Sequence, residues 1–249
     1  MINENYTTNY EVACAILDKL ENGGGSTGGN AIYPSRITFQ SQTDVQEIDI
    51  SGIEFDKVSN LNDFLNGCKN LTRLKGVNNL KNVSNVSQIS SMYKDTINLI
   101  DDGGFHSLPF SEKITSGVGA AFMKCGLPSI DISRWTVKFS GGMSEMFREA
   151  KAVNINISNQ DFSNTTNVSS TAFEYCYNLE QVKCENTIFP AVNFVYFAAS
   201  TKLSKQSILD MFNQLPTASA TVKIPRHILN NLTEDELLIA TNKGWTVNA

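Results

Sequence analysis

The sequence predicts an α/β repeat protein: a solenoid of about six units with an N-terminal helix and a C-terminal α/β cap. The main observation is a pattern written twice within residues 127–179. The segment Ile130–Ser133 (IDIS) returns as Ile155–Ser158 (INIS), and Phe147 returns as Phe173. Self-similarity at a period of about 20 to 50 residues is typical of proteins in which each repeat is one stacked unit.

The N-terminal segment, residues 1–22, is expected to contain a short amphipathic helix. Thr8 and Glu11 have the spacing of a capping box, and apolar residues recur at helical spacing after them. The candidates for an attachment face on this helix are Tyr10, Ile16, Leu17 and Leu20. A Gly-rich linker over residues 23–35 follows, and it lacks the Lys of a phosphate-binding loop. The helix either docks on a partner or folds back over the first repeat, and the sequence leaves both possibilities open.

The predicted solenoid spans residues 36–203, and each unit carries an anchor pair that ends in a large apolar residue. The pairs are Phe64-Leu65, Met92-Tyr93, Ala121-Phe122, Met146-Phe147, Ala172-Phe173 and Tyr196-Phe197. Three positions later lies a small residue, in order Cys68, Thr96, Cys125, Ala150, Cys176 and Ser200. An apolar residue then follows, in order Leu71, Leu99, Leu127, Val153, Leu179 and Leu203. We expect the anchors to form the core and the small residues to be buried spacers, so these cysteines are not redox groups.

A short strand is expected after most anchors, with apolar residues facing the core and polar residues facing outward. The outward residues form the candidate binding surface: Glu47, Asp49, Arg73, Lys75, Asp131, Asn154, Asn156, Gln181 and Lys183. Strands stack about 4.8 Å apart, so six units would make a platform of about 25–30 Å. The third unit, which begins near Leu99, is expected to be irregular.

The composition argues against several classes of function. A net charge of −5 without a basic stripe argues against nucleic-acid binding, and no apolar run approaches the ~18–20 residues that cross a bilayer. The first residues lack the features of a signal peptide. We predict no catalytic residue, no cofactor and no metal site, because no ligand cluster or nucleophile motif is present. His106 and His227 are interpreted as surface or loop residues, and Trp135 as core rather than as an exposed binding aromatic.

Residues 204–249 have the composition of a cap that closes the apolar end of a solenoid. The expected elements are a helix over 207–215, a strand over 221–224, a helix that opens with a Thr233/Glu236 capping box and ends at Lys243-Gly244, and a strand over 245–247. The ending Leu-Thr-x-Glu…Ile-Ala-x-x-Lys-Gly-Trp-Thr resembles that of phage and prophage tail or fibre proteins.

The repeat itself resembles the BspA-like leucine-rich repeats of bacterial surface proteins. The resemblance lies in Leu127-x-x-Ile-Asp-Ile-Ser-x-Trp135, in Met143-Ser-x-Met-Phe147 and in the NVSS…AF…C…NL of residues 167–179. It covers about residues 45–203. It implies a right-handed leucine-rich-repeat solenoid that acts in adhesion or protein binding. Members of that family usually carry a secretion signal, and we expect none in this chain.

The leading functional hypothesis is a bacteriophage virion protein, a tail or fibre component made in the host cytoplasm. The N-terminal helix would bind other virion proteins, and the repeat surface would contact a host glycan or protein. Several copies in one assembly, or a homo-oligomer, would raise the affinity. The alternative is a bacterial surface adhesin or a cytosolic protein-interaction module. A glycan-degrading enzyme is disfavoured because no carboxylate pair stands at a recognisable spacing.

Overall fold

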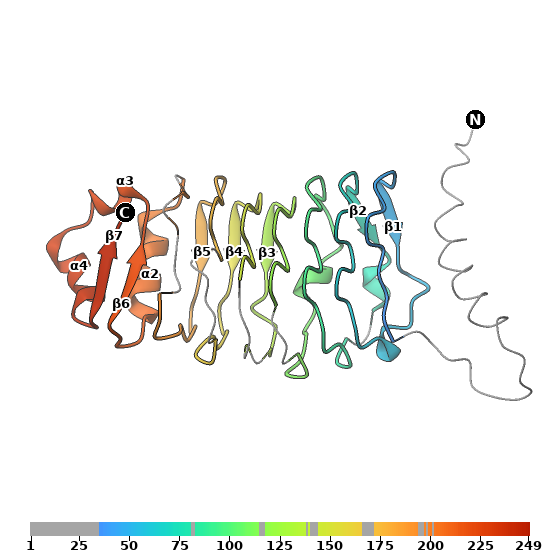
Figure 1. Cartoon of the computed structure of the whole chain (residues 1–249), viewed down its shortest axis with the longest axis horizontal. Coiled ribbons are helices and arrows are strands. Elements are labelled where there is room, and N and C mark those ends of the chain that lie inside the picture. The colour runs from blue at the N-terminus through green and yellow to red at the C-terminus, as the bar shows by residue number, and fades with distance from the viewer. Residues whose placement is uncertain are drawn as a thin grey trace, which may run out of the picture.

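A computed structural model describes residues 35–80, 83–114, 118–137, 139, 144–165, 172–193, 197, 199–200 and 202–249. The predicted N-terminal helix with Tyr10, Ile16, Leu17 and Leu20, nearly all of the Gly-rich linker and Tyr196 lie outside the described residues. The described chain forms turns that stack along one axis, with a helix-containing cap at the C-terminal end (Figure 1). The prediction of a repeat solenoid is therefore confirmed.

Short parallel strands line one side of the turns and form what we call the strand ribbon. Strand β1 (Glu47–Asp49) pairs with β2 (Arg73–Lys75), and β3 (Ser129–Asp131), β4 (Asn154–Asn156) and β5 (Gln181–Lys183) form a second sheet. Between β2 and β3 the described residues contribute one isolated bridge, from Arg73 to Asp101. The ribbon is therefore two short sheets rather than one platform, and the third unit is irregular as predicted.

Within the described residues of the first half, three short 3-10 helices interrupt the turns: η2 (Phe55–Lys57), η3 (Val77–Asn79) and η4 (Phe105–Ser107). Gly76 and Gly104 precede η3 and η4 with φ values of 84° and 83°. Gly76 also lies where the chain approaches its neighbour closely, because a Cβ there would stand 2.3 Å from the Ser51 nitrogen. Only glycine avoids both the left-handed strain and this clash.

The anchor pairs lie in tight turns, which we call the anchor turns. Two left-handed residues flank each described pair in the first four units: Asp63 and Gly67, Ser91 and Asp95, Ala120 and Lys124, and Glu145 and Glu149. Each non-glycine residue in this conformation costs about 1–2 kcal/mol. The N–H groups of these turns donate to carbonyls of the next unit, as in Gly67 N to Lys94 O (2.9 Å) and Lys124 N to Arg148 O (2.8 Å). These bonds offset the strain and join successive units.

The second residues of the anchor pairs stack into an aromatic column along the solenoid. Ring centroids lie 5.3 Å apart for Tyr93 and Phe122, 5.6 Å for Phe122 and Phe147, and 5.0 Å for Phe147 and Phe173. Phe173 and Phe197 follow at 4.7 Å. All are buried, as is every one of the predicted small spacers Cys68, Thr96, Cys125, Ala150, Cys176 and Ser200. The predicted core is confirmed.

One core position differs from the sequence assignment. Val153 is half-exposed, and Ala152 is buried in its place. The reason is that the anchor turn after Phe147 is one residue shorter than the turn after Phe173, so the apolar position arrives one residue earlier. Trp135 is buried, as predicted, and packs against Phe110 with ring centroids 5.3 Å apart.

The cap consists of α2 (Lys205–Gln214), β6 (Ala220–Lys223), α3 (Arg226–Leu229), α4 (Glu234–Thr241) and β7 (Trp245–Asn248), with β6 and β7 parallel. The Thr233/Glu236 capping box is present. Helix α2 begins two residues earlier than expected because Ser204 is its N-cap. The Ser204 N–H donates to Glu180 O (2.9 Å) and the Val182 N–H to Ser207 Oγ (3.0 Å), so α2 covers the open edge of β5.

Candidate functional site

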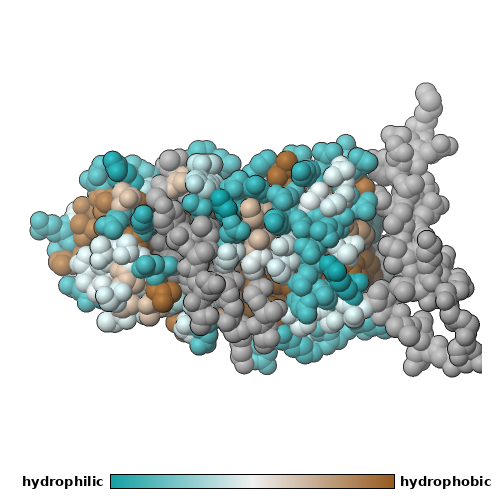
Figure 2. Space-filling view, viewed as in Figure 1, coloured by the Kyte–Doolittle hydropathy of each residue, from teal (hydrophilic) through white to brown (hydrophobic). Residues whose placement is uncertain are grey.

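The strand ribbon places the nine predicted binding residues on its outward face. The middle residue of each strand is buried, and the residues on either side of it are exposed or half-exposed. The outward residues are Glu47, Asp49, Arg73, Lys75, Asp131, Asn154, Asn156, Gln181 and Lys183. The ribbon therefore has the orientation that alternation predicts. Among the residues of the solenoid that Figure 2 colours by hydropathy, hydrophilic ones predominate.

In the β1–β2 segment the outward residues are charged and bind one another. Glu47 lies 2.5 Å from the Lys75 ammonium and 3.8 Å from Arg73, and Arg73 lies 3.3 Å from Asp101. Asp49 accepts a hydrogen bond from the Ser51 N–H at 2.9 Å. Exposed ion pairs of this kind contribute about 0.2–1 kcal/mol each. The charges of this segment are thus engaged with one another.

In the β3–β5 segment the outward residues are mostly uncharged. Asp131 and Asn156 accept hydrogen bonds from the backbone N–H two residues later, at 2.8 and 3.1 Å, and so turn the chain at the ends of β3 and β4. Among the residues that the structure describes, the side chains of Asn154, Gln181 and Lys183 have no hydrogen-bond or ion-pair partner. Asn154 and Gln181 are register partners on adjacent strands. Two amides therefore stand side by side with their donors and acceptors open.

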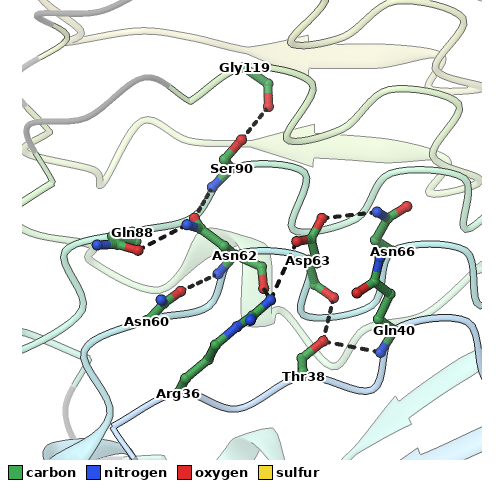
Figure 3. Close-up of polar contacts among 10 residues, drawn as sticks. All are labelled: Arg36, Thr38, Gln40, Asn60, Asn62, Asp63, Asn66, Gln88, Ser90 and Gly119. Atoms are coloured by element: carbon green, nitrogen blue, oxygen red, sulfur yellow. Dashed lines mark hydrogen bonds and ion pairs between the residues drawn. The ribbon is translucent and has the colours of Figure 1, made fainter.

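A second polar cluster joins the first turns of the solenoid (Figure 3). Asn62 donates from its amide to Gln88 Oε1 at 2.9 Å, and its Oδ1 accepts from the Ser90 N–H at 2.8 Å. Ser90 in turn donates to Gly119 O at 3.2 Å, and Arg36 lies 3.4 Å from the Asp63 carboxylate. The cluster runs from one unit to the next, and its hydrogen bonds connect residues of successive units. We interpret it as a structural link rather than a binding surface.

A buried polar network lies in the third unit, at the junction between the two sheets. Asp102 is only 3% exposed, and its Oδ2 accepts from the Tyr93 hydroxyl at 2.6 Å and lies 2.8 Å from His106 Nδ1. The N–H groups of Gly104 and His106 also donate to this carboxylate, at 3.0 and 2.8 Å. The Trp135 indole donates to His106 O at 2.8 Å. The Asp102 carboxylate thus accepts hydrogen bonds from the Tyr93 hydroxyl and from two backbone N–H groups and also contacts the His106 ring.

The interpretation of His106 as a surface or loop residue holds for its place in an irregular segment, but its side chain is only 12% exposed and is paired with Asp102. Burial alone would raise the pKa of Asp102, but hydrogen bonds and charge from His106, with the Tyr93 hydrogen bond, hold this pKa below its usual value. Burial and then the Asp102 charge raise the pKa of Tyr93 well above its usual value. The i,i+4 spacing of Asp102 and His106 was the only sequence signal for this pair.

The cysteines that the structure describes are buried, and burial affects the chemistry of their thiols. Burial raises the pKa of the Cys125, Cys176 and Cys184 thiols to about 12, which leaves them protonated and unreactive at neutral pH. Among the described residues, no group of three His, Cys, Asp or Glu side chains is arranged to hold a metal ion. Within the same residues, no helix is long and apolar enough to span a membrane. Cys14 lies outside the described residues.

The fold and its outward face define a class of protein: a repeat solenoid of short parallel strands over a buried aromatic core. The chain belongs to the family described as "Mycoplasma protein of unknown function, DUF285", whose model matches residues 35–186 and 112–210. This family is related to the BspA-like leucine-rich repeats. The two matches overlap because the repeats resemble one another, so the same family model can be aligned with the array at two starting positions. No curated protein and no solved structure matches the chain.

Proposed function

We propose that the protein is a non-catalytic binding protein whose recognition surface is the β3–β5 segment of the strand ribbon. The observation that carries this proposal is the set of outward side chains on the paired strands β4 and β5, Asn154, Gln181 and Lys183, that have no hydrogen-bond or ion-pair partner among the described residues. Buried strands and the aromatic column hold the backbone of these residues in place. A rigid row of donors and acceptors loses little entropy when it binds a partner. The partner is a glycan or a protein on a cell surface.

Binding of the fluorescently labelled full chain to intact bacterial cells tests the proposal. The triple variant Asn154→Ala/Gln181→Ala/Lys183→Ala should bind at least tenfold more weakly than the unchanged chain. Arg73→Ala/Lys75→Ala is the matched control in the β1–β2 segment, and it should bind within about threefold of the unchanged chain. Equal binding by the triple variant and the unchanged chain would show that the β3–β5 segment is not the recognition surface.

We also propose that the fold is a right-handed leucine-rich-repeat solenoid of about six units. The BspA-like resemblance and the family match support this description. Handedness and repeat number would both be visible in a crystal structure of the full chain. A left-handed path of the chain would contradict this description.

We further propose a bacteriophage tail or fibre as the assembly that carries the protein, on the strength of the C-terminal resemblance. The N-terminal helix would attach several copies to other virion proteins, and the ribbon would face the host. Mass spectrometry of purified particles should find the chain at stoichiometric abundance. Its presence in host cytosol alone would exclude this assembly.

The alternative is a bacterial surface adhesin or interaction module. The observation that favours it is the family description, which names Mycoplasma proteins. Protease treatment of intact cells distinguishes the two assemblies. Loss of the chain from intact bacteria that carry no particles would place it on the cell surface.

A further inference from the structure

Two exposed tyrosines, Tyr175 and Tyr177, mark the anchor turn of the fifth unit. Tyr175 has a φ of 60° at the position that Gly67, Asp95 and Glu149 occupy in other turns. Non-glycine residues adopt the same conformation at this position in other anchor turns, so the left-handed backbone belongs to the turn and what distinguishes the fifth unit is the aromatic side chain that it carries. Tyr175 is 37% exposed and Tyr177 57% exposed, so neither ring is used to fill the core.

The two rings form a held pair, which we call the tyrosine pair. Their centroids lie 5.9 Å apart with an interplanar angle of 37°, and the Tyr177 N–H donates to Tyr175 O at 2.9 Å. The Arg148 guanidinium lies 5.6 Å from the Tyr175 ring centroid. Arg148 is itself held by Glu145 and, at 3.3 Å, by Glu174. The Arg148 guanidinium therefore holds the Tyr175 ring in place, whereas the Tyr177 ring is the more exposed of the two.

We propose that the tyrosine pair is a carbohydrate-binding site. The C–H face of a pyranose ring stacks on an exposed aromatic ring, and its hydroxyl groups require donors and acceptors beside that ring. Asn178 follows Tyr177 in the chain and provides an amide, and the tyrosine hydroxyls can both donate and accept, whereas the Glu174 carboxylate is already paired with Arg148. Tyrosine suits this use because its ring has only two rotatable bonds to immobilise.

Size and charge distinguish this ligand from others. A stable protein interface buries about 800 Å² on each partner, far more than two rings present. The charges around the pair have both signs, since Glu145, Glu149 and Glu174 stand beside Arg148 and Lys124. Lys202 adds a further cation at 3.5 Å from Asn178. The electrostatic field around the pair therefore favours neither a polyanion nor a polycation. Binding of a small neutral sugar does not depend on such a field.

The proposal adds a second site to the proposed binding function and does not depend on the outward residues of β3–β5. An array of neutral and acidic oligosaccharides, incubated with the full chain, selects the ligand. Calorimetry with the neutral oligosaccharide that binds most strongly then gives the dissociation constant, which for a site of this size should be about 0.1–1 mM. Tyr177→Ser should weaken binding at least tenfold, and Tyr177→Phe should stay within about threefold because it keeps the ring.

Two controls keep the outcomes separate. Ile100→Ser changes an apolar side chain that is 63% exposed elsewhere, and it should leave sugar binding unchanged. The β3–β5 triple variant should also bind the sugar normally, because its substitutions lie outside the tyrosine pair. Sugar binding therefore tests the tyrosine pair independently of the recognition surface proposed on β3–β5. Absence of millimolar binding to any oligosaccharide, or unchanged binding in Tyr177→Ser, would overturn the proposal. Selection of acidic glycans alone, or a protein ligand lost in Tyr177→Ser without sugar binding, would overturn it as well.

Discussion

The β1–β2 and β3–β5 segments present their outward residues on similar short parallel strands but use them differently. In β1–β2 the charges of Glu47, Arg73 and Lys75 pair across the strands. In β3–β5 the amides of Asn154 and Gln181 stand in register without a partner among the described residues. Exposed ion pairs add little stability, so the main effect of this pairing is that the side chains of Glu47, Arg73 and Lys75 are already bound to one another and are less available to a partner. Outward side chains on the same kind of strand can therefore either bind those of the neighbouring strand or stay without a partner among the described residues.

The largest expected effect concerns the core that supports β3–β5. Phe147 is fully buried between Phe122 and Phe173 in the aromatic column. Phe147→Ala should lower the free energy of unfolding by about 3–5 kcal/mol, measured by denaturant titration. Phe147→Leu, which keeps most of the volume, should cost less than about 1.5 kcal/mol. A loss below about 1 kcal/mol in the alanine variant would contradict the role of the column.

The next effect concerns the close approach that supports β1–β2. Gly76→Ala combines left-handed strain with a Cβ 2.3 Å from the Ser51 nitrogen, so it should cost about 3 kcal/mol. Gly104→Ala is the matched control: its φ is the same within a degree, but the nearest atom to its Cβ lies 3.5 Å away. That variant should cost only about 1–2 kcal/mol. Equal losses in the two variants would remove the close approach as an explanation.

A middle-sized effect tests the junction between the segments. Asp102→Asn should cost about 1–3 kcal/mol because buried donors lose a charged acceptor. The pKa of Asp102 is lowered on folding, so the carboxylate stabilises the protein above its unfolded pKa of about 3.9, and this contribution is lost as the pH falls through the folded value. The stability difference between the unchanged chain and Asp102→Asn, measured by urea titration, should therefore shrink below about pH 4. A difference independent of pH would contradict the charged state of Asp102.

The smallest effects test the comparison itself. Glu47→Gln should lower stability by about 0.5–1 kcal/mol, and added salt should reduce the difference because it screens exposed pairs. Asn154→Ala should change stability by less than about 0.5 kcal/mol at any salt concentration. Thermal melts at low and high salt measure both variants. A larger loss in Asn154→Ala would mean that its amide is engaged within the fold.

The sequence was sufficient for the core because the anchors recur and their neighbours are small. Phe122, Phe147 and Phe173 align without any knowledge of register between the turns. The shift from Val153 to Ala152 was not predictable in this way, since it depends on the length of one turn. The start of α4 followed from Thr233 and Glu236, whose spacing defines a local hydrogen-bond pattern.

The candidate site was predictable only in part. The alternation of apolar and polar residues predicted that Asn154 and Gln181 face outward. The ion pairs of Glu47 were not predictable, because they depend on which residue of β2 lies opposite Glu47 in the folded sheet. The pairing of His106 with Asp102 lies in an irregular loop where periodicity gives no guide. The tyrosine pair was missed because the exposure of Tyr175 and Tyr177 and the contact between their rings depend on the tertiary structure of the turn, which a periodic pattern does not give.

The hydrogen bonds of the anchor turns bear on how the chain folds during its synthesis. The donors lie in one unit and the acceptors in the unit that follows, as in Gly67 N to Lys94 O and Asp95 N to Met123 O. A unit leaving the ribosome therefore holds strained residues whose bonding partners have not yet been made, for roughly 1–5 s at ordinary rates of synthesis. The most recently made unit is always the incomplete one. The growing end of the nascent chain is thus where chaperones should bind, and the cap is the segment whose arrival ends that exposure.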